Sequence, residues 1–191
     1  MTPEESRAWR PDIEGASTDI LPFYAEWIPR IPKGGRFVEV GVFRGRSLAF
    51  AASLRSDIEL WAVDPWQPVA PTKNYAPLHA SMTDFLATFP DVERLRILRA
   101  PSPAALRVFE DASVDMVFVD GDHAPDAVAA DVTEALRIVK PGGLISGHDY
   151  GVNNGIPAAL ERVLGRVEVA PWDTAEDGWF TGHSLCWWKQ R

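Results

Sequence analysis

Residues 36–47 read RFVEVGVFRGRS, and the interpretation of the whole chain starts from this stretch. The β-branched run over 36–42 predicts a buried strand, and the small residues that follow Gly45 predict a helix. Glu39 stands just before Gly41, the first glycine of the turn between them. Such a turn lets a ligand approach the backbone, and the helix that follows points its N-terminal amides at it. The stretch therefore predicts a ligand-binding loop beside a carboxylate.

The remainder of the chain alternates strand and helix patterns. This alternation predicts an α/β fold, a single Rossmann-like doubly wound sheet that is mostly parallel and has an antiparallel C-terminal edge hairpin. The predicted strands cover residues 36–42, 58–64, 94–100, 113–122, 144–150, 166–170 and 184–191. The predicted helices cover residues 17–32, 45–57, 78–89, 102–111, 125–140 and 156–165.

Composition narrows the partners and the compartment. The chain has 191 residues and a net charge of −8, so a basic nucleic-acid footprint is absent and we expect no nucleic-acid partner. The same charge disfavours an anionic membrane surface, and no apolar run is long enough to span a bilayer, so we expect no membrane partner. Cys186 is the single cysteine, and the first residues lack a signal-peptide pattern. Both features predict a cytoplasmic protein.

Polar residues gather where the predicted strands end. In an open α/β sheet, ligands bind beyond the carboxyl ends of the strands, near the point where the strand order reverses. We therefore expect one site at this edge, formed by residues Glu39, Asp64, Ser102, Asp120, Asp122, His123, His148, Asp149 and Tyr150.

The spacing of the glycine loop indicates which ligand it binds. The dinucleotide fingerprint is not met, because Phe43 occupies the position of its middle glycine. Asp64 lies 64 − 41 = 23 residues beyond Gly41, where a ribose-binding acid is expected. Glu39 would repel a pyrophosphate but would pair with an ammonium or a sulfonium. A nucleoside that carries a ribose, an ammonium group and a sulfonium is S-adenosylmethionine.

Four motifs together, FVEVGVFRGRS, AVDPW, VFVDGDH and VKPGGLISGHDY, resemble those of class I S-adenosylmethionine-dependent methyltransferases. The last two are similar to those of small-molecule O-methyltransferases related to macrocin O-methyltransferase and the cephalosporin-pathway enzymes. The resemblance covers roughly residues 34–152. It implies a single methyltransferase domain over 1–191, with an N-terminal arm and helix (1–33), a cofactor-binding core (34–152) and a C-terminal helix and edge hairpin (153–191).

From the strand-end residues and the resemblance together, we expect the cofactor to be bound by Glu39, Gly41, Gly45, Asp64, Trp66, Ser102 and Asp120. Plain structural readings remain open for each of them. The two glycines would serve a tight turn, and Glu39 would cap or pair with a neighbour. Asp64 would start a turn before proline, Ser102 would cap its helix, and Asp120 would bond to backbone. Trp66 would either lie against the adenine or pack within its loop.

A divalent metal, magnesium or manganese, is the second expected cofactor. Asp120 and Asp149 follow neighbouring strands, which lie about 4.8 Å apart, so both acids would reach one cation. His148 stands where related metal-dependent enzymes usually have an acid or amide. Imidazole suits manganese, iron or zinc better than magnesium, so both metal identity and metal dependence stay open. A purely structural His148 is the alternative.

The catalytic base is expected to be His123, three positions after Asp120. The resembling sugar O-methyltransferases have a proposed base at the matching place, and a histidine accepts protons near neutral pH. Asp122 would orient it or cap the next helix. The alternative for His123 is a surface or capping role, and His79 and His183 are interpreted as ordinary surface residues.

The expected acceptor is a hydroxylated small molecule, such as a sugar or a secondary metabolite. Aromatic side chains in two loops would line its pocket or form a homo-oligomer contact: Trp66, Tyr75, Trp172, Trp179 and Phe180. Two other functions remain open. One is an NAD(P)-dependent oxidoreductase, which shares the sheet and the ribose acid, and the other is a non-catalytic nucleoside-binding protein.

Overall fold

The structure is a computed structural model that describes residues 5, 20–67, 82–89, 93–151, 155–170 and 185–191. Several predicted features lie outside these residues, namely the arm over 1–16 with a cap at Ser17 or Thr18, the aromatic residues Tyr75, Trp172, Trp179 and Phe180, and the histidines His79 and His183. Within the described part of the chain, no helix combines the length and the apolar character that a membrane crossing requires.

One seven-stranded sheet organises the molecule, in the order β3-β2-β1-β4-β5-β7-β6. The strands β1 to β5 run parallel, and β7 pairs antiparallel with both β5 and β6. This confirms the predicted sheet and its antiparallel edge. The bounds are β1 Arg36–Val40, β2 Glu59–Val63, β3 Leu95–Leu98, β4 Val114–Val119, β5 Val139–Gly147, β6 Glu168–Val169 and β7 Trp187–Gln190.

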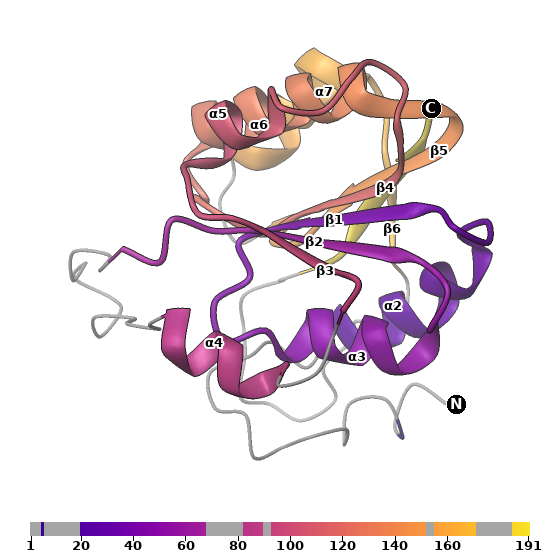
Figure 1. Ribbon diagram of the computed structural model, residues 1–191. Helices are drawn as coiled ribbons and strands as arrows, with labels where there is room; N and C mark the ends of the chain where they lie inside the picture. The colour runs from indigo at the N-terminus through magenta and orange to yellow at the C-terminus, as the bar shows by residue number, and fades with distance from the viewer. Residues whose placement is uncertain (1–4, 6–19, 68–81, 90–92, 152–154, 171–184) are drawn as a thin grey trace.

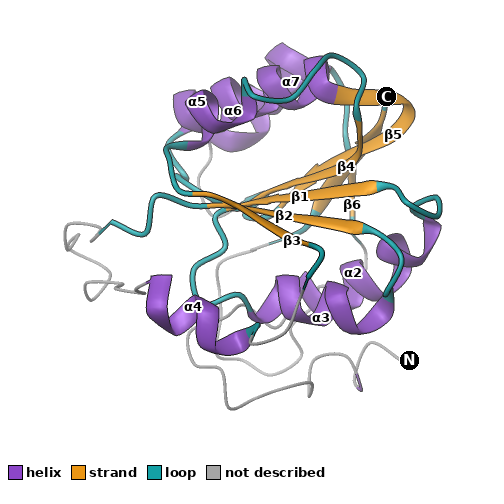
Figure 2. Ribbon diagram, in the orientation of Figure 1, coloured by secondary structure: helices purple, strands orange, loops and turns teal. Residues whose placement is uncertain are grey.

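Helices cover both faces of this sheet (Figure 1). The helices α2, α3 and α4 lie on one face, and α5, α6 and α7 lie on the other, as the doubly wound prediction requires (Figure 2). The bounds are α2 Ile20–Trp27, η1 Ile28–Arg30, α3 Arg46–Leu54, α4 Met82–Thr88, α5 Ser102–Leu106, α6 Pro125–Ile138 and α7 Gly155–Leu164. The chain leaves β1 toward β2 and β3 and returns to β4 on the other side, so the strand order reverses between β1 and β4.

The strands are buried on both faces because each face has its own apolar layer. All six residues of β4 are buried, which is typical of a central strand in a parallel sheet. Successive side chains point to opposite faces. Phe37, Met116 and Phe118 accordingly belong to the core beneath α2 and α3, whereas Val38 and Val117 belong to the core beneath α5 to α7.

The join between α6 and β5 differs from the prediction. Instead of a helix over 125–140 that ends at the Pro-Gly-Gly segment, α6 ends at Ile138 and β5 begins at Val139. The segment lies inside β5, where the pairing with β4 shifts register. Gly143 is needed there, because a β-carbon would lie 2.7 Å from the carbonyl oxygen of Asp115. The strand ends at Gly147, so His148 and Asp149 lie on the loop beyond it.

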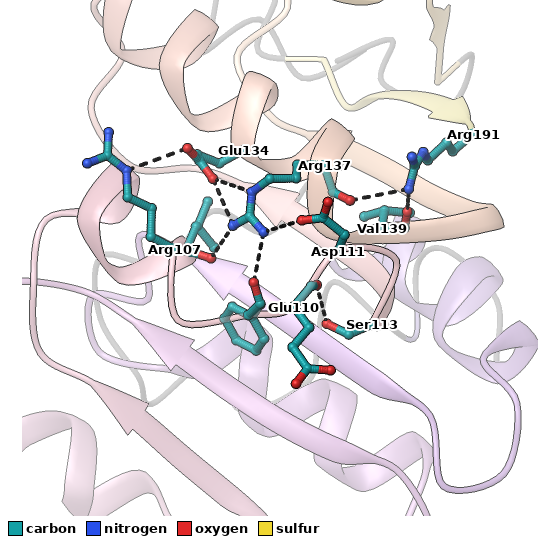
Figure 3. Close-up of polar contacts among 10 residues, drawn as sticks. Arg107, Glu110, Asp111, Ser113, Glu134, Arg137, Val139 and Arg191 are labelled. Atoms are coloured by element: carbon teal, nitrogen blue, oxygen red, sulfur yellow. Dashed lines mark hydrogen bonds and ion pairs between the residues drawn. The ribbon is translucent and has the colours of Figure 1, made fainter.

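A network of polar contacts fixes the C-terminal end of α6 (Figure 3). The Arg137 guanidinium donates to the carbonyl oxygens of Leu106 and Phe109, which end the α5 region, and to the carboxylates of Asp111 and Glu134. Arg191, the last residue, donates to the carbonyl oxygens of Arg137 and Val139. This network lies at the end of α6 away from His123, and it holds the helix that carries part of the candidate site.

Candidate active site

The glycine loop joins β1 to α3, and both of its glycines adopt a left-handed backbone. Gly41 has φ +82, and a β-carbon there would lie 2.0 Å from the carbonyl oxygen of Asp120. Gly45 has φ +80, and a β-carbon there would lie 2.6 Å from the ring of Phe85. Each glycine is therefore required by the packing of the protein itself, which fits the tight-turn reading. Direct contact of either glycine with a cofactor stays a prediction.

Asp64, which follows β2, holds this loop. Its Oδ2 accepts hydrogen bonds from the amides of Val42 and Phe43, both 2.9 Å long, and its Oδ1 accepts one of 2.6 Å from the amide of Trp66. The predicted ribose acid thus organises the backbone of two strand-end loops in this structure. Lone pairs remain on both oxygens, so a role in binding a ribose hydroxyl is compatible with these contacts.

Trp66 packs against the glycine loop and against α4. Its side chain is buried and packs on Phe85 with ring centroids 4.9 Å apart, and its indole nitrogen donates to the carbonyl oxygen of Phe43 at 2.9 Å. Of the two roles the sequence left open, this geometry favours packing within the loop over contact with an adenine.

Glu39 points from β1 into the layer beneath α2 and α3. Its Oε1 accepts a hydrogen bond of 2.6 Å from Ser47, and its Oε2 accepts one of 3.0 Å from Tyr24. Burial raises the pKa of Glu39 to about 8, against the opposing effect of these two hydrogen bonds. Glu39 is 2% exposed, and its two hydrogen bonds tie α2 and α3 to the end of β1.

The acids at this edge share one region of space. The carboxylates of Asp120 and Asp64 both act electrostatically on Glu39 and raise its pKa further. They follow or lie on β4, β2 and β1, three adjacent strands. Because Glu39 keeps its proton up to about pH 8, a cation would be attracted by the carboxylates of Asp120 and Asp64 rather than by Glu39. The observed arrangement therefore suits a ligand with a positive charge, as the sulfonium and ammonium groups of S-adenosylmethionine provide.

Ser102 begins α5 but does not cap it, because the N-cap residue is Pro101. The Ser102 hydroxyl instead donates a hydrogen bond of 2.6 Å to Oδ1 of Asp131 on α6. This bond joins the loop after β3 to the helix after β4. The capping alternative for Ser102 is therefore wrong, and its contact with the cofactor stays a prediction.

Two acids and two histidines converge beyond β4 and β5. His123 Nδ1 lies 3.0 Å from Asp149 Oδ2, and His123 Nε2 lies 3.7 Å from Asp120 Oδ1. His148 Nδ1 lies 3.5 Å from Asp120 Oδ1 and 3.5 Å from Asp149 Oδ1. We call these four residues the Asp–His cluster.

The cluster differs from the predicted metal set in one respect. Ligand atoms of Asp120, His123 and Asp149 lie within 4.8 Å of one another, a spacing that would suit a metal ion. The sequence instead grouped His148 with the two acids and kept His123 apart as the base. His148 is buried, whereas the His123 side chain is 51% exposed. Which histidine serves which role stays a prediction.

The surroundings of His123 favour protonation. The hydrogen bond to Asp149 raises the pKa of His123 above its usual value, against the effect of desolvation. Asp122 does not provide this contact, because its Oδ1 accepts a hydrogen bond of 2.9 Å from the amide of Ala124 and so shapes the turn before α6. Asp149 is the residue that orients His123, and its backbone has φ +60, a strained value of the kind found at functional sites.

Three residues that matter here were not singled out from the sequence. Tyr24 and Ser47 hold Glu39, and Asp131 holds Ser102. A signal for Asp131 was available, because an acid at this position of α6 stands on the same helical face as Val128 and Val132. No comparable pattern marked Tyr24 or Ser47, whose partners come from other elements.

A doubly wound sheet with a glycine loop and acidic side chains at the carboxyl ends of its strands is compatible with a nucleoside-binding site. The family described as a methyltransferase domain matches residues 38–150, more than half of the chain. The chain belongs to this methyltransferase family. In the comparison with curated protein sequences, nothing matched.

Solved structures of methyltransferases share the fold. An rRNA methylase from Streptococcus thermophilus has a TM-score of 0.64 at 12% identity, over 91% of this chain and 96% of that one. An S-adenosylmethionine-dependent O-methyltransferase from Thermotoga maritima has a TM-score of 0.60 at 16% identity, over 88% and 63%. Fibrillarin from Aeropyrum pernix, bound to S-adenosyl-L-methionine, has a TM-score of 0.55 at 14% identity, over 82% and 66%.

Proposed function

We propose that this methyltransferase uses S-adenosylmethionine to methylate a hydroxyl group of a small molecule, such as a sugar or a secondary metabolite, with the help of a divalent metal. The observation that supports the proposal is the Asp–His cluster, a histidine–carboxylate pair and further side chains that could hold a metal ion, at the edge where the glycine loop lies. Methyl transfer to an alcohol needs these two devices because an aliphatic hydroxyl is a weak nucleophile near neutral pH.

The cofactor would be held by the residues around the glycine loop. When bound, S-adenosylmethionine supplies a methyl group that its sulfonium has already activated. Asp64 would bind the ribose hydroxyls while it keeps the amides of Val42 and Phe43 in place. Asp120 would face the positive charge, and Glu39 would support the loop through Ser47. In this role Glu39 positions the site more than it contacts the ligand.

His123 would take the proton of the acceptor hydroxyl. It is the more exposed of the two histidines, and Asp149 orients its ring through Nδ1, which leaves Nε2 for the acceptor. A positioned base of this kind typically contributes a factor of about 10²–10⁴ to the rate. The role follows the same logic as other histidine–carboxylate pairs, in which the acid fixes the ring and stabilises its protonated form.

A divalent metal would be held by Asp120 and Asp149, with His148 as the third ligand. His148 Nδ1 lies 3.5 Å from an oxygen of each acid, and this proximity supports the proposed ligand set. Because one ligand is an imidazole, we expect the site to prefer manganese or iron over magnesium. The metal would orient and acidify the acceptor hydroxyl.

Calorimetry tests the cofactor part directly. The purified protein should bind S-adenosylhomocysteine, the demethylated product of the cofactor, and an absence of binding at millimolar concentration would refute the proposal. For the acceptor, transfer of a labelled methyl group would be measured to a library of sugars and phenols and, in parallel, to rRNA fragments. Methylation of rRNA alone would overturn the small-molecule assignment, which the net charge of −8 supports.

The two histidines are tested against each other. If the roles are as proposed, His148→Gln weakens manganese binding in calorimetry, whereas His123→Gln keeps manganese binding and loses turnover. The opposite pattern would exchange the two roles. Asp115→Asn is the control for metal binding, because Asp115 is a buried carboxylate near the start of β4, at the opposite end of the strand from Asp120, and is bonded to Lys140. It should leave metal binding unchanged.

A further inference from the structure

Asp131 is an acid in the apolar core beneath α6. Its side chain is 1% exposed and stands on the helix face that also buries Val128, Val132 and Ala135. Its Oδ1 accepts the hydrogen bond from Ser102, so one half of the carboxylate is satisfied by the loop after β3. An ionised carboxylate is seldom enclosed in this way unless its oxygens have partners or a function requires it.

The second oxygen of Asp131 is buried and has no hydrogen-bond partner among the described residues. It faces the loop after β4, because a β-carbon built on Gly121 would lie 3.9 Å from it. Gly121 directly follows Asp120, which belongs to the Asp–His cluster. The two oxygens of one carboxylate therefore face the two loops that flank the ligand edge, one after β3 and one after β4.

This arrangement is unfavourable for stability alone. Burial raises the pKa of Asp131 to about 6, although the hydrogen bond from Ser102 acts in the opposite direction and Asp122 adds repulsion. At neutral pH the fold therefore encloses a carboxylate whose charge is poorly solvated. Such a group is typical of positions retained for a site, because an apolar or amide side chain would stabilise the same core better.

We propose that Asp131 is a positioning residue of the cofactor site, which fixes the loops after β3 and β4 relative to each other so that Ser102 and Asp120 are correctly spaced for the bound nucleoside. The inference rests on the proposed function. Asp131 acts through its hydrogen bond with Ser102 and through α6, the helix that follows the loop after β4. Because its side chain is enclosed, it would not itself touch the cofactor.

The test uses Asp131→Asn and measures affinity for S-adenosylhomocysteine together with the melting temperature of the unliganded protein. Asparagine keeps one oxygen for the Ser102 hydroxyl, but a neutral amide accepts this hydrogen bond less strongly than a carboxylate does, and an NH₂ group takes the place of the second oxygen. We expect affinity to fall by about 10-fold or more, which corresponds to about 1.4 kcal/mol. The melting temperature should stay the same or rise, because a buried charge has been removed.

Asp115→Asn is the control. Asp115 is a buried carboxylate near the start of β4, at the opposite end of the strand from Asp120, and its partners are the amide of Arg36 and the ammonium of Lys140. This variant should melt earlier and bind the ligand as the wild type does. A merely structural role for Asp131 would give the same pattern as the control, and the inference would then be wrong. Unchanged affinity in Asp131→Asn would overturn it equally.

Ser102→Ala provides a second test, which does not depend on the folding of Asp131→Asn. It removes only the hydrogen bond to Oδ1 and should also weaken binding. In the double variant the two losses should not add, because one change removes the bond between Ser102 and residue 131 and the other weakens that same bond, whereas additive losses would contradict it. If the wild type fails to bind S-adenosylhomocysteine, the proposed function falls together with this inference. Wild-type binding with unaffected variants would overturn the inference alone.

Discussion

The α-carbon of Gly41 lies against the carbonyl group of Asp120, so closely that a β-carbon at position 41 would be 2.0 Å from that oxygen. This contact joins the end of β1 to the end of β4, the two strands between which the sheet reverses its order. The amide of Asp120 in turn donates to the carbonyl oxygen of Val40 at 2.8 Å. The candidate site is thus built on two strand ends in direct backbone contact.

The first prediction follows from this contact. Gly41→Ala should lower the free energy of unfolding by at least about 3 kcal/mol, because it adds a steric clash with backbone to a left-handed φ. It should also abolish binding of S-adenosylhomocysteine. Gly142→Ala is the matched control, since Gly142 has nearly the same φ, +83, but no atom of the described part of the chain lies within 4 Å of the added carbon. The control should lose only about 1–2 kcal/mol and keep binding. Equal losses in urea denaturation would contradict the steric reading.

The raised pKa of Glu39 predicts how the stability of the protein depends on pH. Its pKa is raised from 4.5 to about 8 in the folded protein. Between these values the unfolded chain loses the proton and the folded chain keeps it, so the contribution of Glu39 to stability is fully present below about pH 4.5 and is lost as the pH rises to about 8.

Glu39→Gln removes this dependence. The stability of the variant relative to wild type should therefore increase steadily from pH 5 to pH 8 and then level off, with a gain on the order of 2–4 kcal/mol. Urea titrations at several pH values would measure it. A difference that stays constant over the range would show that Glu39 ionises normally, and the tight packing with Tyr24 and Ser47 would then need another explanation.

A substitution of Asp64 should lower both the stability of the protein and its affinity for the cofactor product. Its two oxygens accept from three backbone amides, and an asparagine has one oxygen to offer and would direct an NH₂ group at an amide donor. Asp64→Asn should therefore cost about 1–3 kcal/mol of stability and weaken binding of S-adenosylhomocysteine. Asp57→Asn changes the same charge at a half-buried site beside Arg55 and should leave binding unchanged. Calorimetry and thermal melts on both variants provide the check.

Arg137 predicts a purely structural effect. Its guanidinium donates to two backbone carbonyls and two carboxylates, so Arg137→Ala should lower the free energy of unfolding by about 1.5–3 kcal/mol. Arg107→Ala is the control, because Arg107 is largely exposed and, among the described residues, pairs with Glu134 alone, at 3.6 Å. That variant should change stability by less than about 1 kcal/mol. Cofactor affinity should survive in both, and a selective loss of affinity in Arg137→Ala would contradict this reading.

Much of the fold could be predicted because its signals are local. The apolar runs at 36–40 and 114–119 can be buried on both faces only as central strands, and the helical spacing over 125–138 fixes α6. The boundary between α6 and β5 was misjudged because a Pro-Gly-Gly segment is typical of a turn. Here its backbone pairs with β4 through a register shift, which depends on a strand far away in the sequence.

Sequence alone determined which residues would gather at the ligand edge, since the carboxyl ends of parallel strands must lie together once the strand order is known. It did not determine what each of them touches. The Ser102–Asp131 bond, the enclosure of Glu39 by Tyr24 and Ser47, and the pairing of His123 with Asp149 each join different elements. Only the packing of helices on the sheet brings such partners within hydrogen-bonding distance, and that packing decides whether an acid binds a ligand or supports the loop that does.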